Sequence, residues 1–287
     1  MYESKIFEEQ SLLFYKLESN DSSSWLTVCP ERGGIITEFG VKGKQIFYVN
    51  EETLFDRTKP IRGGNPILFP ISGRLEMDEY EWGREKYRMP IHGVARNYPW
   101  KVKQIETGRD FAKVTIQFVS NQETKKMYPF DFKLLFTYMI NETELKIEQT
   151  YVNETNEPMP LYAGFHPYFR TKADSIVINS SIDEYFDFQD GLIKPLTDSI
   201  DKKNLCESVL LKKDGHPFSF SLGGKTFDIK TGTEFRYIIL WTEGDKDYIC
   251  VEPWMTQPNE MNRKEELIMV PSGGRLETFI SIEVKSE

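Results

Sequence analysis

Short runs of β-branched and aromatic residues, each closed by a turn signal, recur along almost the whole chain. In the clearest case, the runs 132–140 and 144–152 flank Asn141-Glu142-Thr143, and the second run alternates in polarity. A period of two residues is that of a β-strand, so this region predicts an antiparallel hairpin. Further strands are expected at residues 25–28, 44–49, 112–118, 175–179, 235–241, 248–251 and 275–284.

Helix signals are scarce, and the best short candidates are Glu51–Asp56 and Asn121–Met127. Many strands at roughly regular spacing with few helices indicate a sandwich or barrel. No low-complexity linker or fixed-period repeat divides the 287 residues. We therefore expect one all-β domain spanning residues 1–287, since one large core fits a chain of this length.

The chain carries a net charge of −9 and has a pI near 5.1. Binding to nucleic acid needs a basic stripe, so this charge argues against a nucleic-acid partner. No apolar run approaches the about 18 residues of a membrane span, and the first residues lack an export signal, so we expect a cytoplasmic protein. Cys29, Cys206 and Cys250 are odd in number and widely spaced, which favours reduced thiols and argues against a metal site.

The loop from Arg62 to Leu75 combines Gly63-Gly64 with two prolines, which shape a backbone but interrupt a sheet ladder. The arginines at its ends, Arg62 and Arg74, offer planar donors for hydroxyl pairs, carboxylates or phosphates. The alternative is that each arginine ties the loop to a neighbouring glutamate. The loop lacks the Gly-Lys-Ser/Thr ending of a nucleotide-binding P-loop.

Two of the three histidines lie in unusual surroundings. His166 stands in an aromatic run, 161–169, where Pro167 restricts its backbone to extended geometry and Gly164 leaves room for a ligand. A proton donor needs such an orientation, although a histidine in an apolar run is more often a core residue. His92, followed by Arg96 and Trp100, fits the edge of a pocket, whereas His216 fits a turn.

Glu252 ends the apolar run 248–251 and precedes Pro253 and Trp254. An apolar strand end and an indole ring can desolvate the carboxylate and raise its pKa, which suits a general base near neutral pH. Trp254 also offers a flat face to the C–H surface of a sugar, with an ordinary core tryptophan as the alternative.

Taken together in this order, these segments resemble those of the aldose 1-epimerases, the galactose mutarotase-like family. The resemblance runs from about Gly63 to Arg275 and implies a large antiparallel β-supersandwich with an open cleft and few short helices. It also implies that His166 is the catalytic acid, Glu252 the base, and His92 and Arg74 substrate-binding residues. The motifs that carry it are Gly63-Gly64-Asn65-Pro66-Ile67-Leu68-Phe69-Pro70, Gly73-Arg74-Leu75, His92-Gly93 with Arg96 and Trp100, His166-Pro167-Tyr168-Phe169 and Glu252-Pro253-Trp254.

The implied reaction interconverts the α and β anomers of a hexose without metal or cofactor, with a free sugar as the only partner and the protein a monomer or weak homodimer. The family also has an acidic substrate-binding residue between His166 and Glu252, for which Asp183 and Asp187 are candidates. Arg62 resembles an arginine that the hexose-6-phosphate 1-epimerase branch uses near the phosphate, and Arg96 is in a position to assist it. Two further hypotheses are a non-catalytic carbohydrate-binding protein, which would not need a paired acid and base, and a glycoside hydrolase, which would need a second carboxylate.

Overall fold

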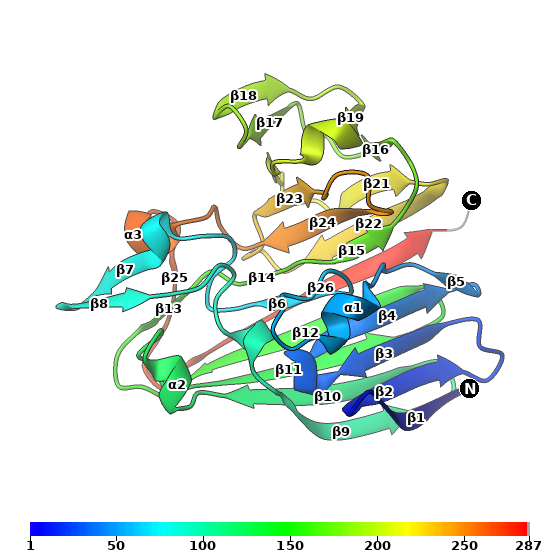
Figure 1. Cartoon of the computed structure of the whole chain (residues 1–287), viewed down its shortest axis with the longest axis horizontal. Coiled ribbons are helices and arrows are strands. Elements are labelled where there is room, and N and C mark those ends of the chain that lie inside the picture. The colour runs from blue at the N-terminus through cyan, green and yellow to red at the C-terminus, as the bar shows by residue number, and fades with distance from the viewer. Residues whose placement is uncertain (286–287) are drawn as a thin grey trace.

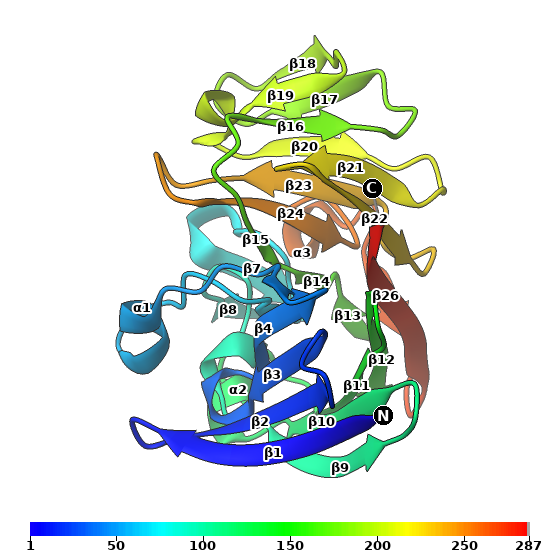
Figure 2. The ribbon, with the colours of Figure 1, turned by 90° about the vertical axis from the view of Figure 1, so that its right-hand side faces the viewer.

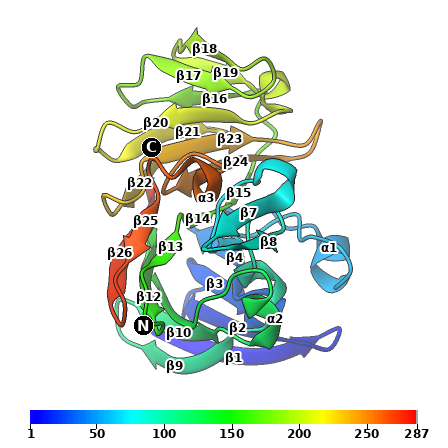
Figure 3. The ribbon, with the colours of Figure 1, turned by 90° about the vertical axis from the view of Figure 1, so that its left-hand side faces the viewer.

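The computed structural model describes residues 1–285, which form three large β-sheets whose strands pair antiparallel. Figures 1, 2 and 3 show the N-terminal strands at one end of the molecule and strands β16 to β19 at the other. The long strands β12 and β26 run along one side, and α1, β7 and β8 lie on the opposite side. The expected all-β fold with few short helices is confirmed.

The largest sheet has nine strands, and its centre is the predicted hairpin of Phe132–Ile140 and Glu144–Asn153. Apolar side chains alternate along the first of these strands, and every second residue is buried. This is the pattern of a sheet with one face on the core. The strands, in spatial order, are β19 (Ser199–Asp201), β16 (Ser175–Ile178), β21 (Phe218–Leu222), β22 (Lys225–Thr231), β26 (Arg275–Lys285), β12 (Glu144–Asn153), β11 (Phe132–Ile140), β10 (Ala112–Val119) and β9 (Lys101–Thr107).

An eight-stranded sheet carries the residues that the sequence singled out. Its strand β24 is buried along its whole length, unlike the alternating β11. The strands, in spatial order, are β18 (Leu192–Pro195), β17 (Glu184–Asp187), β20 (Val209–Lys212), β23 (Tyr237–Trp241), β24 (Tyr248–Trp254), β14 (Gly164–Phe165) and β6 (Ile67–Leu68), with β15 (Tyr168–Arg170) also paired to β24.

The remaining elements are a five-stranded N-terminal sheet, two small ribbons and several short helices. The five strands are β1 (Tyr2–Glu9), β2 (Leu12–Ser19), β3 (Trp25–Cys29), β4 (Ile35–Val41) and β5 (Lys44–Gln45). The ribbons are β7 (Glu79–Trp82) with β8 (Glu85–Arg88), and β13 (Met159–Leu161) with β25 (Ile268–Val270). The helices are α1 (Glu51–Phe55), α2 (Gln122–Lys125) and α3 (Glu260–Arg263), with 3-10 turns at Pro30–Arg32, Glu76–Asp78, Ala95–Asn97 and Lys202–Leu205.

One hydrophobic cluster draws on all three large sheets. It includes Phe39 of the five-stranded sheet, Phe136 of the nine-stranded sheet and Val251 of the eight-stranded sheet, all of them fully buried. Apolar burial on this scale is the main stabilising contribution to a fold. The cluster packs the core-facing side of β24 and so holds the opposite side of that strand in a fixed position.

Three local predictions differ from the structure. The expected strand 44–49 ends after Gln45, and Phe47 and Val49 form only isolated bridges. The strand-like aromatic run 161–169 is divided among three short strands. It is interrupted at residues 162–163 and again at 166–167, where Pro167 lacks a backbone donor. Strand β24 continues through Pro253 to Trp254, so Glu252 lies inside the strand instead of at its end.

No helix within residues 1–285 is both long enough and apolar enough to cross a membrane.

Candidate active site

The register of the eight-stranded sheet places His166 opposite Glu252. On one side of the histidine Gly164 pairs with Trp254, and on the other side Tyr168 pairs with Cys250. His166 lies two residues from Gly164 and from Tyr168, and Glu252 lies two residues from Trp254 and from Cys250. In this register His166 and Glu252 therefore face each other. Residues directly opposite each other in an antiparallel pair present their side chains on the same face with neighbouring Cβ atoms. Strand pairing alone therefore brings the two groups together, although they are far apart in the sequence.

The two side chains meet at the bottom of a cleft of about 690 Å³. His166 Nε2 lies 3.4 Å from Glu252 Oε1, and only 6% and 1% of the two residues are exposed. The other carboxylate oxygen, Oε2, accepts a hydrogen bond of 3.1 Å from the indole Nε1 of Trp254. His166 Nδ1 is buried and has no hydrogen-bond partner among the residues that the structure describes.

Burial moves the pKa values of this pair in opposite directions. It raises the pKa of Glu252 well above its usual value, and the Trp254 hydrogen bond and Arg96 charge only partly offset this. Burial, reinforced by the positive charge of Arg96, lowers the pKa of His166 to about 3. Both shifts favour neutral side chains, because a charge costs free energy in a dry site. At neutral pH the pair therefore carries one transferable proton, on the carboxyl group, in addition to the N–H of the neutral imidazole.

A second histidine closes the bottom of the cleft. The ring of His92 lies 5.4 Å from that of His166 and 5.8 Å from that of Trp254, both edge to face. Its Nδ1 accepts a hydrogen bond of 3.1 Å from the Gly73 backbone. Burial lowers its pKa well below the usual value, so the ring is neutral and its remaining proton is on Nε2. The ring therefore offers one donor toward a ligand.

Two glycines make room for the indole of Trp254. A Cβ on Gly164 would lie 2.8 Å from the indole Cδ1, and a Cβ on Gly73 would lie 2.9 Å from its Cζ3. Real Cβ atoms do not approach other atoms this closely, so larger residues at either position would push the ring aside. Because the same ring donates to Glu252, these glycines help to position the carboxylate.

The chain matches the sequence profile of the family described as "Aldose 1-epimerase" over residues 16–261. This match covers far more than half of the chain. The chain belongs to the aldose 1-epimerase family.

This member of the aldose 1-epimerase family is also similar to individual proteins. A crystal structure of a protein from Synechocystis sp. PCC 6803 is 31% identical, covers 96% of each chain and has a TM-score of 0.89. A galactose mutarotase-like protein from Clostridium acetobutylicum is 20% identical over 99% of each chain, with a TM-score of 0.80, and so shows the same fold. The "Putative glucose-6-phosphate 1-epimerase" of Escherichia coli K12 is 29% identical over 160 residues, which are 55% of this chain and 49% of that protein. The match spans about half the length of that curated relative.

The structure brings most of the predicted site residues of this family member to one cleft. Arg62 and Arg74 lie at its rim, where Arg62 stacks 5.3 Å from the centre of the Trp241 ring and pairs with Glu243 at 3.4 Å. The full lining is Arg62, Gly73, Arg74, Leu75, Glu76, Ile91, His92, His166, Phe188, Glu207, Ser208, Trp241, Glu252, Trp254, Pro258 and Asn259.

Arg96 does not line the cleft. Arg96 is half-buried and lines a separate cavity. Its Nη2 donates to the Ile91 carbonyl at 3.2 Å, and its Nε has no partner among the described residues. It influences the cleft through its charge, which contributes to lowering the pKa values of His92 and His166. The geometry therefore argues against a direct contact between Arg96 and a sugar in the cleft.

The two acidic residues suggested by the sequence, Asp183 and Asp187, also lie outside the cleft lining. Asp187 is buried and its carboxylate is held by Lys194 at 2.6 Å and by the Gln189 backbone at 2.8 Å. The acidic residue that does reach the cleft from this part of the chain is Glu207, next to Ser208. Sequence reasoning missed Glu207 because it stands in a turn without a motif.

One group of side chains could hold a metal ion. Donor atoms of His166, Cys250 and Glu252 lie within 4.8 Å of one another, the one such cluster found in residues 1–285. Cys250 is fully buried, and burial raises the pKa of its thiol well above the usual value. A metal bound at this position would have to displace the proton of this thiol, because the thiolate is the form that coordinates.

Proposed function

We propose that the protein is an aldose 1-epimerase that interconverts the α and β anomers of a free hexose. The observation that carries this proposal is the buried His166–Glu252 pair, separated by 3.4 Å at the bottom of an open cleft. A sugar ring placed above the pair would present its ring oxygen and anomeric hydroxyl to two proton-exchanging groups. The family match supports the same reaction.

The reaction needs one proton to leave the anomeric hydroxyl and one to reach the ring oxygen. Glu252 accepts the hydroxyl proton while protonated His166 donates to the ring oxygen. The bond between C1 and the ring oxygen breaks, and C1 becomes an aldehyde. After rotation about the C1–C2 bond, the ring closes on the other face and both transfers run in reverse.

The proton that the pair shares allows this exchange of roles. In the empty cleft, burial favours the proton on Glu252. Hydrogen bonds to the ionised carboxylate from sugar hydroxyls and from Trp254 would move the proton to His166, because such bonds favour the charged form. His92 and the Trp254 face would orient the ring, and each positioned proton-transfer group contributes about 10²- to 10⁴-fold to the rate.

Charge at the rim favours a free sugar. Arg74 pairs with Asp78 at 3.3 Å and Arg62 pairs with Glu243 at 3.4 Å, so neither arginine is an unpaired cation. The carboxylate of Glu207 also lines the cleft, and carboxylates accept hydrogen bonds from hydroxyls but repel phosphate. A hexose 6-phosphate is the second candidate, supported by Arg62 in the cleft and by the partial match to the Escherichia coli protein.

The test is anomer exchange measured by NMR at equilibrium for glucose, galactose and glucose 6-phosphate in a weakly catalytic buffer. We expect faster exchange for a free sugar. We also expect His166→Ala to abolish the acceleration while sugar affinity stays within about tenfold. Equal exchange rates for variant and wild type would contradict the role given to His166. Acceleration of the phosphate alone would select the second candidate.

A further inference from the structure

One end of the cleft lies beyond Trp254 and is built by two segments that are far apart in the sequence. A Cβ on Gly73 would lie 2.9 Å from the Pro258 Cβ and 2.9 Å from the Trp254 ring, so the loop after Gly73 meets the segment after β24 at this indole. Glu76 of the first segment and Asn259 of the second both line the cleft. Side chains of these two segments can therefore reach a sugar that lies against Trp254.

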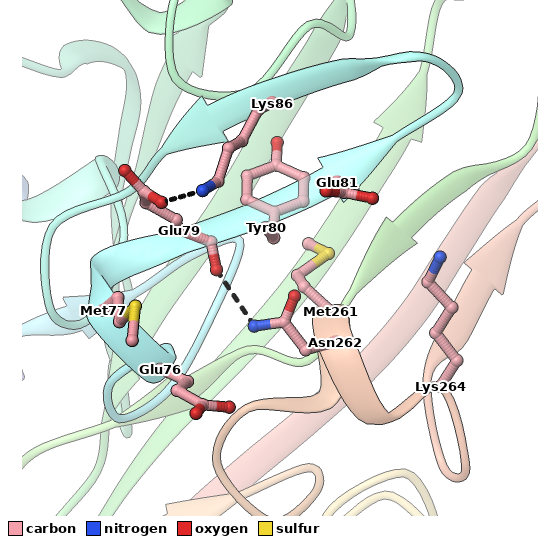
Figure 4. Close-up of a pocket in the computed structure, with 9 residues that line it drawn as sticks. All are labelled: Glu76, Met77, Glu79, Tyr80, Glu81, Lys86, Met261, Asn262 and Lys264. Carbon is pink, nitrogen blue, oxygen red and sulfur yellow. Dashed lines mark hydrogen bonds and ion pairs between the residues drawn. The ribbon is translucent and has the colours of Figure 1, made fainter.

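The side chain of Asn259 joins the two segments. Its Oδ1 accepts hydrogen bonds of 3.1 Å from the Glu76 backbone N–H and of 2.7 Å from Nδ2 of Asn262. Nδ2 of Asn262 also donates to the Glu79 carbonyl at 2.9 Å, and Figure 4 shows this bond between α3 and β7. We call these three hydrogen bonds the asparagine clamp. The clamp fixes the amide of Asn259 relative to both segments.

The backbone conformation of Asn259 is one that few residue types adopt. Its φ is 69°, in the left-handed region that glycine and asparagine tolerate better than other residues. An asparagine that precedes a helix usually accepts hydrogen bonds from the backbone of that helix. The Asn259 side chain makes no such bond to α3 and contacts the Glu76 backbone instead. The backbone and the clamp therefore account for the Oδ1 of this residue, but not for its Nδ2.

The clamp leaves Nδ2 of Asn259 as an unused donor. Because Oδ1 accepts both clamp bonds, the other end of the amide is the nitrogen, which carries two N–H donors. This nitrogen donates no hydrogen bond within residues 1–285. Asn259 is partly exposed and lines the cleft, whereas the charge of the nearby Arg74 is already paired with Asp78 at 3.3 Å. Asn259 therefore offers an uncharged donor, which suits a hydroxyl oxygen.

We propose that Asn259 donates from Nδ2 to one hydroxyl group of the bound hexose, and that Asn262 is the positioning residue that aims this donor. The contact rests on the proposed epimerase function, which puts the sugar above the His166–Glu252 pair and beside Trp254. A donor that is held in place before binding loses less side-chain entropy than one that must be ordered. One neutral hydrogen bond changes affinity by about 2- to 10-fold. Asn259 therefore favours sugars that carry this hydroxyl over analogues that lack it.

The test is an NMR titration of the full chain with glucose and with the monodeoxy glucoses that lack the hydroxyl at C2, C3, C4 or C6. The informative variant is Asn259→Gly, because glycine adopts a positive φ without strain. For one analogue, the affinity lost relative to glucose in the wild type, about 2- to 10-fold, should disappear in Asn259→Gly. Glucose itself should bind this variant more weakly by the same factor. The control Asn20→Ala, at an exposed turn outside the cleft lining, should leave every affinity unchanged.

A second variant, Asn262→Ala, tests the clamp. It should reduce the preference for the same hydroxyl in part. The combined variant Asn259→Gly with Asn262→Ala should bind sugars as Asn259→Gly alone does, because Asn262 acts through Asn259. A merely structural role would instead lower the affinities for glucose and for every analogue by one common factor. Thermal melting confirms that each variant is folded.

The contact is overturned if Asn259→Gly binds glucose as tightly as the wild type, if it weakens all the sugars equally, or if no sugar binds the wild type saturably. Anomer exchange by the wild type, measured in the same samples, tests the proposed function separately. Exchange without a hydroxyl-specific difference would keep the epimerase and remove the Asn259 contact. A hydroxyl-specific difference without exchange would keep the contact and remove the epimerase.

Discussion

The bottom and the rim of the cleft are built in different ways. At the bottom, His92, His166, Glu252 and Trp254 are at most 7% exposed, and strand register places His166 opposite Glu252. At the rim, the Arg74 side chain is 62% exposed and its charge is already paired with Asp78. Glu252 and Trp254 belong to β24 and His166 lies between β14 and β15, whereas the buried His92 and the exposed Arg74 lie in loops. The sheet therefore positions the His166–Glu252 pair, and we expect the loops at the rim to affect which sugar binds.

Among the substitutions considered below, replacing Glu252, the proposed base, should produce the largest effect. We expect Glu252→Gln to lower kcat/KM at least ~10³-fold, because the amide cannot accept the hydroxyl proton. The side chain keeps its shape, so sugar affinity should stay within about tenfold. NMR exchange rates and a sugar titration would check both numbers. Retained activity in this variant would remove Glu252 from the mechanism.

The same substitution should stabilise the fold. The raised pKa of Glu252 means that ionising it costs folding free energy, and this cost appears as pH rises above the unfolded pKa of about 4.3. A glutamine avoids the cost. We expect the Tm advantage of Glu252→Gln to be near zero at pH 4 and to reach a few degrees, about 2–5 °C, at pH 7. Glu81→Gln, at an exposed position, is the control for the loss of one carboxylate.

The two tryptophans of the cleft provide a matched pair of smaller changes. Trp254 donates to Glu252, whereas Trp241 contacts the His166 ring edge to face. Trp254→Phe removes the donor and should lower kcat about tenfold, the cost of one hydrogen bond to a charged group. It should also raise the pKa of Glu252 further. Trp241→Phe should lower kcat less, and an equal loss in both variants would argue against a role for the hydrogen bond.

Changes at the rim should be weaker still. We expect Arg74→Gln to change KM for glucose by about two- to threefold with little change in kcat, since exposed ion pairs contribute about 1 kcal/mol or less. Arg62→Gln should have a larger effect, because Arg62 is half-buried against Trp241. Steady-state kinetics on the two variants would test the order. A large drop in kcat for Arg74→Gln would place the rim in the chemical step.

Lowering the pH from 7 to 5 should change activity least. An unshifted histidine titrates near 6.5, but the pKa of His166 is lowered to about 3, so the pair keeps its single transferable proton over this range. Activity should instead fall on the alkaline side, where the raised pKa of Glu252 is passed and the shared proton is lost. A pH profile of kcat/KM measures both limbs. A half-maximal point near pH 6.5 would contradict the shift assigned to His166.

Alternating polarity and turn residues predicted many of the strands and short helices, because these elements depend mainly on residues close together in the sequence. The hairpin 132–152 agrees with β11 and β12 almost to the residue, and both short helices lie where their signals predicted. The predictions were wrong where tertiary pairing decides. Residues 44–49 have strand-like side chains, yet only Lys44 and Gln45 find a ladder partner, and β24 extends past Pro253 because neighbouring strands flank it.

The site was harder to predict than the fold. The sequence singles out His166, Glu252, His92 and Trp254 but contains nothing about their distances, which depend on pairing between β14, β15 and β24. Glu207 and Phe188 were missed because their segment carries no motif. Arg96 lines a different cavity from the cleft, and the sequence contains nothing about which cavity its side chain reaches.

The pairing that places His166 opposite Glu252 also determines when the site forms during folding. The two groups become neighbours only after segments 86 residues apart in the sequence have paired, and such non-local pairing is slow to form. A partly folded chain that lacks this pairing does not yet contain the site. Recovery of anomer exchange during refolding would therefore report completion of the eight-stranded sheet, and it should lag behind the formation of the local hairpin β11–β12.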